Sequence, residues 1–158
     1  LTVPTVVAPS TAEAGSYVDV YWKVFNAGTG GAGGSWYDSV YLQKVGTSET
    51  ISLGSFQYTS GLGAGRFYER TEQFRMPVNT QGLYQVVVRT NATGSLFENG
   101  VTNNNTGIAV DPLTLALAPH PDLQVESITA PATAAASTAR RPRSSTPASR
   151  PANGTPSM

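Results

Sequence analysis

Apolar and polar side chains alternate along most of the first 117 residues, with the two-residue period that is typical of a β-strand. In one nine-residue run, Val18, Val20 and Trp22 share one face of the chain, while Asp19 and Lys23 share the other. That pattern predicts a strand with one buried and one exposed face. Comparable runs, separated by turns rich in glycine, proline and asparagine, predict strands over residues 3–7, 17–25, 35–44, 50–58, 66–76, 82–90 and 107–117.

The number and spacing of these runs predict the fold class. About seven short strands follow one another with turns every ~8 to 15 residues, and helical periodicity is almost missing. We therefore expect an all-β domain over residues 1–117, an immunoglobulin-like antiparallel β-sandwich of about seven strands.

A glycine-rich segment, Gly28-Thr29-Gly30-Gly31-Ala32-Gly33, matches the G-x-G-x-x-G pattern of dinucleotide-binding loops. That pattern holds a pyrophosphate only where it opens a helix. The residues that follow predict a strand instead. We interpret the segment as a flexible hairpin turn, in which glycine adopts positive φ without steric cost.

The chain changes character after the predicted sandwich. Residues 118–122, Ala-Pro-His-Pro-Asp, predict a proline-rich linker. Beyond it, Ile128-Thr129-Ala130-Pro131 is similar to Val6-Val7-Ala8-Pro9, which lies 122 positions earlier. We interpret residues 123–134 as the first strand of a truncated second repeat.

Residues 135–158 consist almost entirely of Ala, Ser, Thr, Pro and Arg, and Met158 is their one hydrophobic residue larger than alanine. Such a segment cannot bury enough apolar surface to offset the entropy of ordering it, so we expect a disordered tail. Two origins stay open: a gene read out of frame, and a natural spacer. The encoding DNA distinguishes them.

The charge of the chain limits the classes of partner that it can bind. Charged residues make up 13% of it, against about 25% in an average soluble domain. Four of the ten basic residues follow residue 139, where there are no acids, so residues 1–139 carry a net charge of −4. We expect binding neither to nucleic acid nor to an anionic membrane surface.

No apolar run reaches the roughly 18 residues of a membrane helix, so no membrane insertion is expected.

The residues that most enzymes use are scarce. The chain has no cysteine and one histidine, His120, which lies between two prolines. No nucleophile elbow, zinc-protease motif or phosphate-binding loop is present. We expect a protein that is not an enzyme and needs no cofactor. Leu1 is not an initiator methionine, and the start is typical of the middle of a longer chain.

Several short motifs occur in a characteristic order. They are Asn26-Ala27-Gly28-Thr29-Gly30, Trp36-Tyr37-Asp38-Ser39-Val40-Tyr41-Leu42, Leu53-Gly54-Ser55-Phe56, Gly82-Leu83-Tyr84, Phe97-Glu98-Asn99-Gly100 and Asn104-Asn105-Thr106. In this order they resemble the CARDB domain, the cell adhesion related domain found in bacteria. The resemblance covers about residues 3–117, and Pro121-Asp122-Leu123-Gln124-Val125 resembles the first strand of another such domain. It implies an immunoglobulin-like sandwich, often in tandem, in secreted or surface proteins of bacteria and archaea. It implies no reaction.

Two residues depart from the pattern of that family. Thr102 stands where an acidic residue often precedes the paired asparagines, which weakens a carboxylate-rich ion site in this loop. Glu72 stands where an apolar residue is usual, on the same face as Tyr68 and Phe74. An edge strand would keep its carboxylate solvated.

Several side chains that carry oxygen are candidate ligands for calcium. Hard oxygen donors suit this ion, and the candidates are Asp38, Glu98, Asn99, Asn103 and Asn104. The alternative is that Asp38 accepts hydrogen bonds from backbone groups and that the asparagines form turns. Both interpretations stay open.

Exposed tyrosines are the candidates for a partner or glycan surface. Alternation places Trp22 in the core and Tyr17, Tyr21, Tyr37 and Tyr41 on outward faces. If their two strands are neighbours, these tyrosines form an exposed aromatic strip that suits a protein or a sugar. The alternative is ordinary cross-strand aromatic pairing.

Together these features predict a non-catalytic extracellular adhesion or spacer module, one repeat of a larger modular bacterial surface or secreted protein. Its expected partners are neighbouring repeats of the same chain, a surface protein or a glycan. Two alternatives stay open: a glycan- or calcium-dependent binding module, and an accessory domain of a secreted hydrolase.

Overall fold

The computed structural model describes residues 1–119 and 121–129. Contacts divide the chain into a compact unit, Leu1–Pro121, and a second unit that begins at Asp122. Residues 122–129 form no strand, and Leu123, Val125 and Ile128 among them are exposed. The second repeat predicted for residues 123–134 stays a prediction, since 130–134 lie outside the described residues. The tail predicted for 135–158 also lies outside them.

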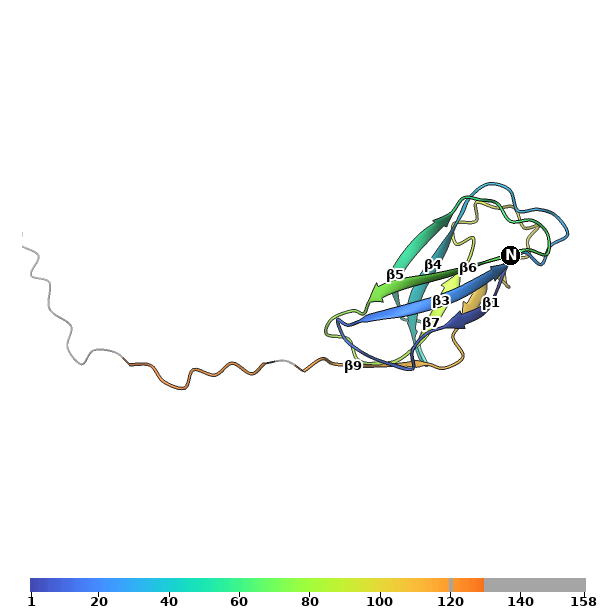
Figure 1. Cartoon of the computed structure of the whole chain (residues 1–158). Coiled ribbons are helices and arrows are strands. Elements are labelled where there is room, and N and C mark those ends of the chain that lie inside the picture. The colour runs from blue at the N-terminus through green and yellow to red at the C-terminus, as the bar shows by residue number, and fades with distance from the viewer. Residues whose placement is uncertain (120, 130–158) are drawn as a thin grey trace, which may run out of the picture. The chain divides into compact units, whose positions relative to one another are not determined.

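The first unit is built from nine strands, and the described residues include no helix (Figure 1). Six of the predicted strands are present close to their expected bounds, and the predicted strand 107–117 is two strands, separated by residues 109–112. A three-residue strand that the alternation did not indicate is also present. In chain order the strands are β1 (Thr2–Val7), β2 (Thr11–Glu13), β3 (Tyr17–Phe25), β4 (Trp36–Lys44), β5 (Thr50–Tyr58), β6 (Phe67–Arg75), β7 (Gly82–Arg89), β8 (Thr106–Ile108) and β9 (Leu113–Ala116).

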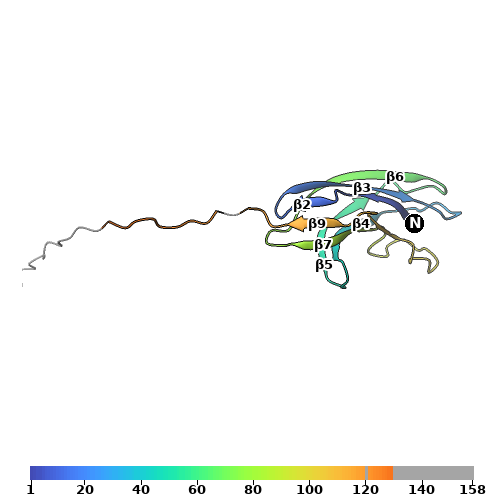
Figure 2. The same ribbon diagram turned by 90° about the horizontal axis from the view of Figure 1, so that it is seen from below.

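The strands form two layers, which Figure 2 shows edge on. One sheet has the order β1-β3-β6, with antiparallel neighbours throughout. The other has the order β2-β9-β7-β4-β5, with β8 paired to β7. Its pairs are antiparallel except for β2 and β9. The predicted all-β sandwich is confirmed.

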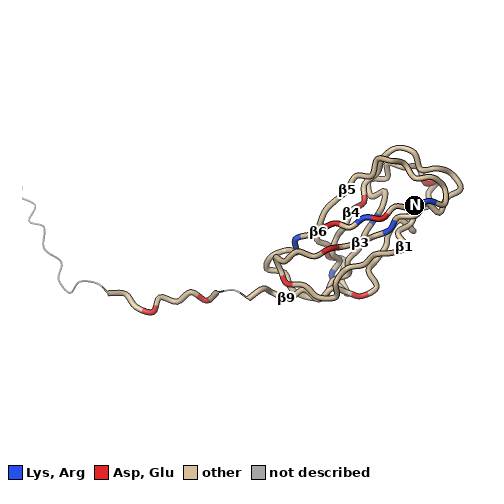
Figure 3. The backbone as a smooth tube through the Cα atoms, in the orientation of Figure 1, with Lys and Arg blue, Asp and Glu red and all other residues tan. Residues whose placement is uncertain are grey.

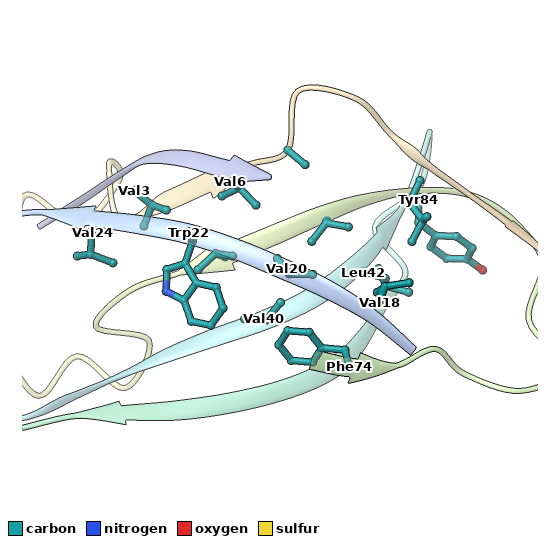
Figure 4. Close-up of a cluster of buried hydrophobic side chains, with 14 of the residues drawn as sticks. Val3, Val6, Val18, Val20, Trp22, Val24, Val40, Leu42, Phe74 and Tyr84 are labelled. Atoms are coloured by element: carbon teal, nitrogen blue, oxygen red, sulfur yellow. The ribbon is translucent and has the colours of Figure 1, made fainter. Parts of the chain in front are cut away.

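The core lies between the two sheets, where the inward positions of the strands meet (Figure 4). Trp22 is fully buried on β3, as predicted, and Val40 and Leu42 are fully buried on β4. Each fully buried aliphatic side chain contributes about 1.5–3 kcal/mol to the stability of the fold. Burial of these alternating apolar side chains therefore supplies most of the free energy that brings the two sheets together.

Glu72 lies on β6, at the edge of the three-stranded sheet. Its side chain is half-buried, and Arg70 Nε lies 3.8 Å from its carboxylate. The edge position expected for this acid is confirmed. It explains how a carboxylate occupies a position that is otherwise apolar.

Candidate functional site

Two loops and the start of the chain enclose a groove at one end of the sandwich. Figure 1 shows residues 26–35 and 90–105 at the end that carries the N-terminus. The groove has a volume of about 570 Å³. It is lined by Leu1, Asn26, Ala27, Gly28, Gly30, Gly31, Ala32, Gly33, Leu96, Phe97, Glu98, Asn99, Val101 and Asn104.

The glycine-rich wall of the groove is organised by one buried side chain, Asn26. Its Nδ2 donates to the carbonyl oxygens of Gly30 and Leu62, both at 2.9 Å, and its Oδ1 accepts from Gly28 N at 3.0 Å. These hydrogen bonds satisfy backbone groups of the glycine-rich loop. They also hold the loop in one conformation, which glycine residues alone would not specify. The segment joins β3 to β4, which lie in different sheets, so the predicted hairpin turn is wrong: it is a crossover loop.

The opposite wall is organised around Glu98. Its Oε1 accepts hydrogen bonds from Asn91 Nδ2 and Asn105 Nδ2, each at 2.6 Å, and its Oε2 accepts from the amino group of Leu1. The Asn91 side chain also bonds the backbone of Leu96 across the turn, since its Nδ2 donates to the carbonyl oxygen and its Oδ1 accepts from the amide. The φ angle of Asn91 itself is +47°. Asparagine tolerates this left-handed conformation better than most residues. The asparagines of this loop therefore fix its shape.

The electrostatics of Glu98 follow from these contacts. Burial by itself raises the pKa of its carboxyl group, but hydrogen bonds from the Leu1 amino group, Asn91 and Asn105 outweigh burial, and the net pKa lies below its ordinary value. The Glu98 carboxyl group is thus ionised, and its hydrogen bonds to the protein hold the loop together.

Apolar side chains at the rim of the groove are the feature that the fold itself does not require. Phe97 is 90% exposed and Val101 is 52% exposed, although both lie within the polar loop. Asn99 and Asn104 lie beside them in the lining, and the lining contains neither lysine nor arginine. This surface can contact an apolar face while its amides bond hydroxyl or carbonyl groups. The sequence signal was present: Leu96-Phe97 is the one apolar pair in an asparagine-rich stretch.

The calcium candidates are divided between two places. Glu98, Asn99 and Asn104 belong to the groove, and Asn103 is exposed in the same loop. Asp38 is fully buried on β4, and its Oδ2 accepts from Trp22 Nε1 at 2.9 Å and from the Tyr68 hydroxyl at 2.7 Å. Within residues 1–119 and 121–129, no three Asp, Glu or His side chains gather at one point. The two candidate carboxylates, Asp38 and Glu98, are therefore engaged separately.

Asp38 instead organises an aromatic cluster in the core. The Tyr68 hydroxyl also accepts from Trp36 Nε1 at 3.1 Å, and its ring stacks on Tyr58 with centroids 3.9 Å apart. Burial, and then the charge of Asp38, raise the pKa of Tyr68 far above its ordinary value. One of the two interpretations of Asp38 from the sequence gave it backbone donors. Its observed donors are side chains from the opposite sheet, which alternation cannot identify.

The predicted tyrosine surface does not form a single strip. Tyr17 and Tyr21 lie on the outward side of β3, and Tyr37 and Tyr41 on the outward side of β4. Their outward direction is as predicted, with Tyr17 64% exposed. Since β3 and β4 belong to different sheets, the two pairs of tyrosines face opposite sides of the sandwich. The prediction of a common aromatic strip is therefore wrong.

Comparisons with known proteins bear on the fold. No protein-family model and no curated protein matches the chain. The crystal structure of the CARDB domain of a Pyrococcus furiosus protein in complex with di-metal ions matches with a TM-score of 0.53 and 16% identity, covering 73% of this chain and 86% of that one. A solution NMR structure of the same Pyrococcus furiosus domain matches with a TM-score of 0.52 and 17% identity, covering 73% of this chain and 93% of that one. The chain has the CARDB fold, as the motifs predicted.

Proposed function

We propose that this chain, which has the fold of the CARDB domain, is a non-catalytic adhesion module of a secreted or surface protein, and that it contacts its partner through the loop groove. The observation that carries the proposal is Phe97, 90% exposed on a loop whose backbone is fixed by buried side chains. A large exposed aromatic ring on an ordered loop is typical of a binding surface.

The lining of the groove favours an uncharged saccharide as the partner. An aromatic ring suits the apolar face of a sugar, and the amides of Asn99 and Asn104 suit its hydroxyl groups. The one carboxylate in the lining, Glu98, is already bonded to amides of the protein. A cationic ligand would find only this engaged carboxylate, and an anionic ligand would find neither lysine nor arginine among the lining residues.

Calcium dependence is not supported by the donor set. The similar Pyrococcus furiosus domain was crystallised with di-metal ions, but in this chain the two acidic candidates are separately engaged, Asp38 by aromatic donors and Glu98 by amides. We therefore propose that adhesion by this domain does not depend on calcium.

The part of the chain that the structure describes contains no helix with the length and hydropathy of a membrane span.

A glycan array tests the proposal, using the whole chain and the variants Phe97→Ala and Val110→Ala. Val110 is 91% exposed and does not line the groove, so its variant removes a similar exposed apolar side chain elsewhere. We expect retention on uncharged saccharides, lost in Phe97→Ala and kept in Val110→Ala, with or without a chelator. Retention that Phe97→Ala leaves unchanged, or no retention at all, contradicts the proposal.

A further inference from the structure

The strands that end the two sheets differ in how their open edges are protected. An edge exposes unpaired backbone donors and acceptors, which natural proteins protect with charge, proline, bulges or short length. β1 contains Pro4, and its register with β3 shifts between Thr2 and Thr5. β2 has only three residues. β6 has charges of both signs along its length, as Figure 3 shows.

β5 has neither charge, proline nor short length to protect its edge. Its nine residues, Thr50–Tyr58, include no charged residue and no proline. One extra residue interrupts its register with β4, opposite the step from Val40 to Tyr41. Near its end, the carbonyl oxygen of Gln57 accepts a bond of 3.3 Å from Arg70 Nη2. In the described part of the chain, no other side chain bonds the backbone of this strand.

The inward side chains of β5 are also incompletely covered. Ile51, Leu53, Phe56 and Tyr58 pack against the core, yet each remains partly exposed. The physical reason lies in the sheets, because the facing sheet has three strands and ends at β6. β5 therefore carries an open backbone edge beside an apolar row that its own domain leaves half-covered.

We propose that β5 pairs edge to edge, antiparallel, with β5 of a second copy of this domain. A two-fold axis brings the half-covered apolar row of one copy beside the same row of the other, and each buries part of the other. On the outward side, a two-fold axis between Leu53 and Gly54 places Ser52 of one copy opposite Ser55 of the other, and no charged residue of β5 opposes a like charge. This pairing is independent of the loop groove and goes beyond the proposed adhesion.

The polarity of the edge favours a second copy over an unrelated peptide. Both sides of β5 match themselves, apolar beside apolar and hydroxyl beside hydroxyl, whereas β5 offers no charge that would select a charged peptide. An isologous pair also closes after two copies, since each copy has one such edge. The expected assembly is a dimer.

Sedimentation of the whole chain over a range of concentrations, up to millimolar, tests the pairing. The variant Ser52→Lys/Ser55→Lys places lysines on exposed positions of β5, where two copies would oppose them. Its matched control, Thr71→Lys/Gln73→Lys, places lysines on exposed positions of β6, the other nine-residue edge. Circular dichroism establishes that each variant keeps its sheet.

We expect a reversible dimer whose dissociation constant rises by about tenfold or more in the β5 variant and stays unchanged in the β6 variant. Backbone amides of β5 should exchange more slowly in the dimer. A protein that stays monomeric at every concentration overturns the proposal. So does a larger open-ended assembly, or a dimer that the two variants weaken equally.

Discussion

The indole Nε1 of Trp22 donates a hydrogen bond of 2.9 Å to Oδ2 of Asp38, and both side chains are fully buried. Trp22 lies on β3 and Asp38 on β4, so the bond joins the two sheets across the core. The Tyr68 hydroxyl, from β6, donates to the same oxygen at 2.7 Å. A single carboxylate thus receives two donors from the opposite sheet, which fixes how the layers face each other.

Replacing Asp38 by alanine should be strongly destabilising. The change leaves Trp22 Nε1 without its acceptor in the core, removes an acceptor of the Tyr68 hydroxyl, and opens a small void. We expect Asp38→Ala to lower the free energy of unfolding by about 3–5 kcal/mol, measured by urea titration. Asp19→Ala is the matched control, because Asp19 is exposed on β3. Equal stability of the two variants would contradict this role for Asp38.

The hydroxyl of Tyr68 should make the stability of the domain fall at alkaline pH. Burial and the charge of Asp38 raise the pKa of Tyr68 above its ordinary value of 10.0. The folded state therefore keeps this proton where the unfolded state loses it, so the stabilisation is complete below pH 10 and is lost as the pH rises further. Tyr68→Phe should flatten this alkaline fall, whereas Tyr17→Phe, at an exposed position, should leave it unchanged.

At neutral pH the same variant should be mildly destabilising. Tyr68→Phe keeps the ring that stacks on Tyr58, but it removes the acceptor of Trp36 Nε1 and one donor to Asp38. We expect a loss of about 1–3 kcal/mol in the free energy of unfolding. A larger loss in Tyr17→Phe than in Tyr68→Phe would be inconsistent with the cluster described for Asp38.

The alternation of residue types predicted the strands because burial on one face imposes a period of two. It could not assign strands to sheets, since an outward side chain looks the same on either layer. Tyr21 and Tyr41 therefore had the right direction, but they face opposite sides. Likewise, Asp38 could be placed inward by parity, but its donors come from strands that only the folded topology brings near.

The groove was predictable in part. Glu98 and Asn99 were candidates because oxygen-bearing side chains cluster in their loop, and the structure places both in the groove lining. Their expected purpose was an ion, whereas Glu98 is bonded by the amides of Asn91 and Asn105. That pairing depends on loop conformation, including the positive φ of Asn91, which no sequence periodicity encodes.

The Glu98 carboxylate should hold the asparagine-rich loop in a pH-dependent way. Its pKa is depressed in the folded state, so its stabilisation is present above the ordinary pKa of 4.5 and is lost as the pH falls through the lower folded value. Amide exchange at Leu96, corrected for intrinsic rates, should then accelerate on acidification. Glu98→Gln should speed exchange at neutral pH and remove this acid dependence, whereas Glu49→Gln, on an exposed turn, should do neither.

Gly107 should not tolerate a side chain. A Cβ at this position of β8 would lie 2.6 Å from both Cγ1 and the carbonyl oxygen of Val3, so β1 would have to move. We expect Gly107→Ala to cost about 1–3 kcal/mol of unfolding free energy by thermal and urea denaturation. Gly30→Ala is the control, since a Cβ there meets no atom within 4 Å. A neutral Gly107→Ala would contradict this packing of β1 against β8.

The location of the contact surface is tested most directly by titrating an array-retained saccharide into isotope-labelled protein and following its backbone amides by NMR. A partner bound in the groove should shift amides of residues 26–34 and 96–104, and Phe97→Ala should abolish these shifts. The amides around Tyr21 and Tyr41, on the two outer faces, should stay unchanged. Shifts that centre on either tyrosine face, with the loops unaffected, would contradict the assignment of adhesion to the loop groove.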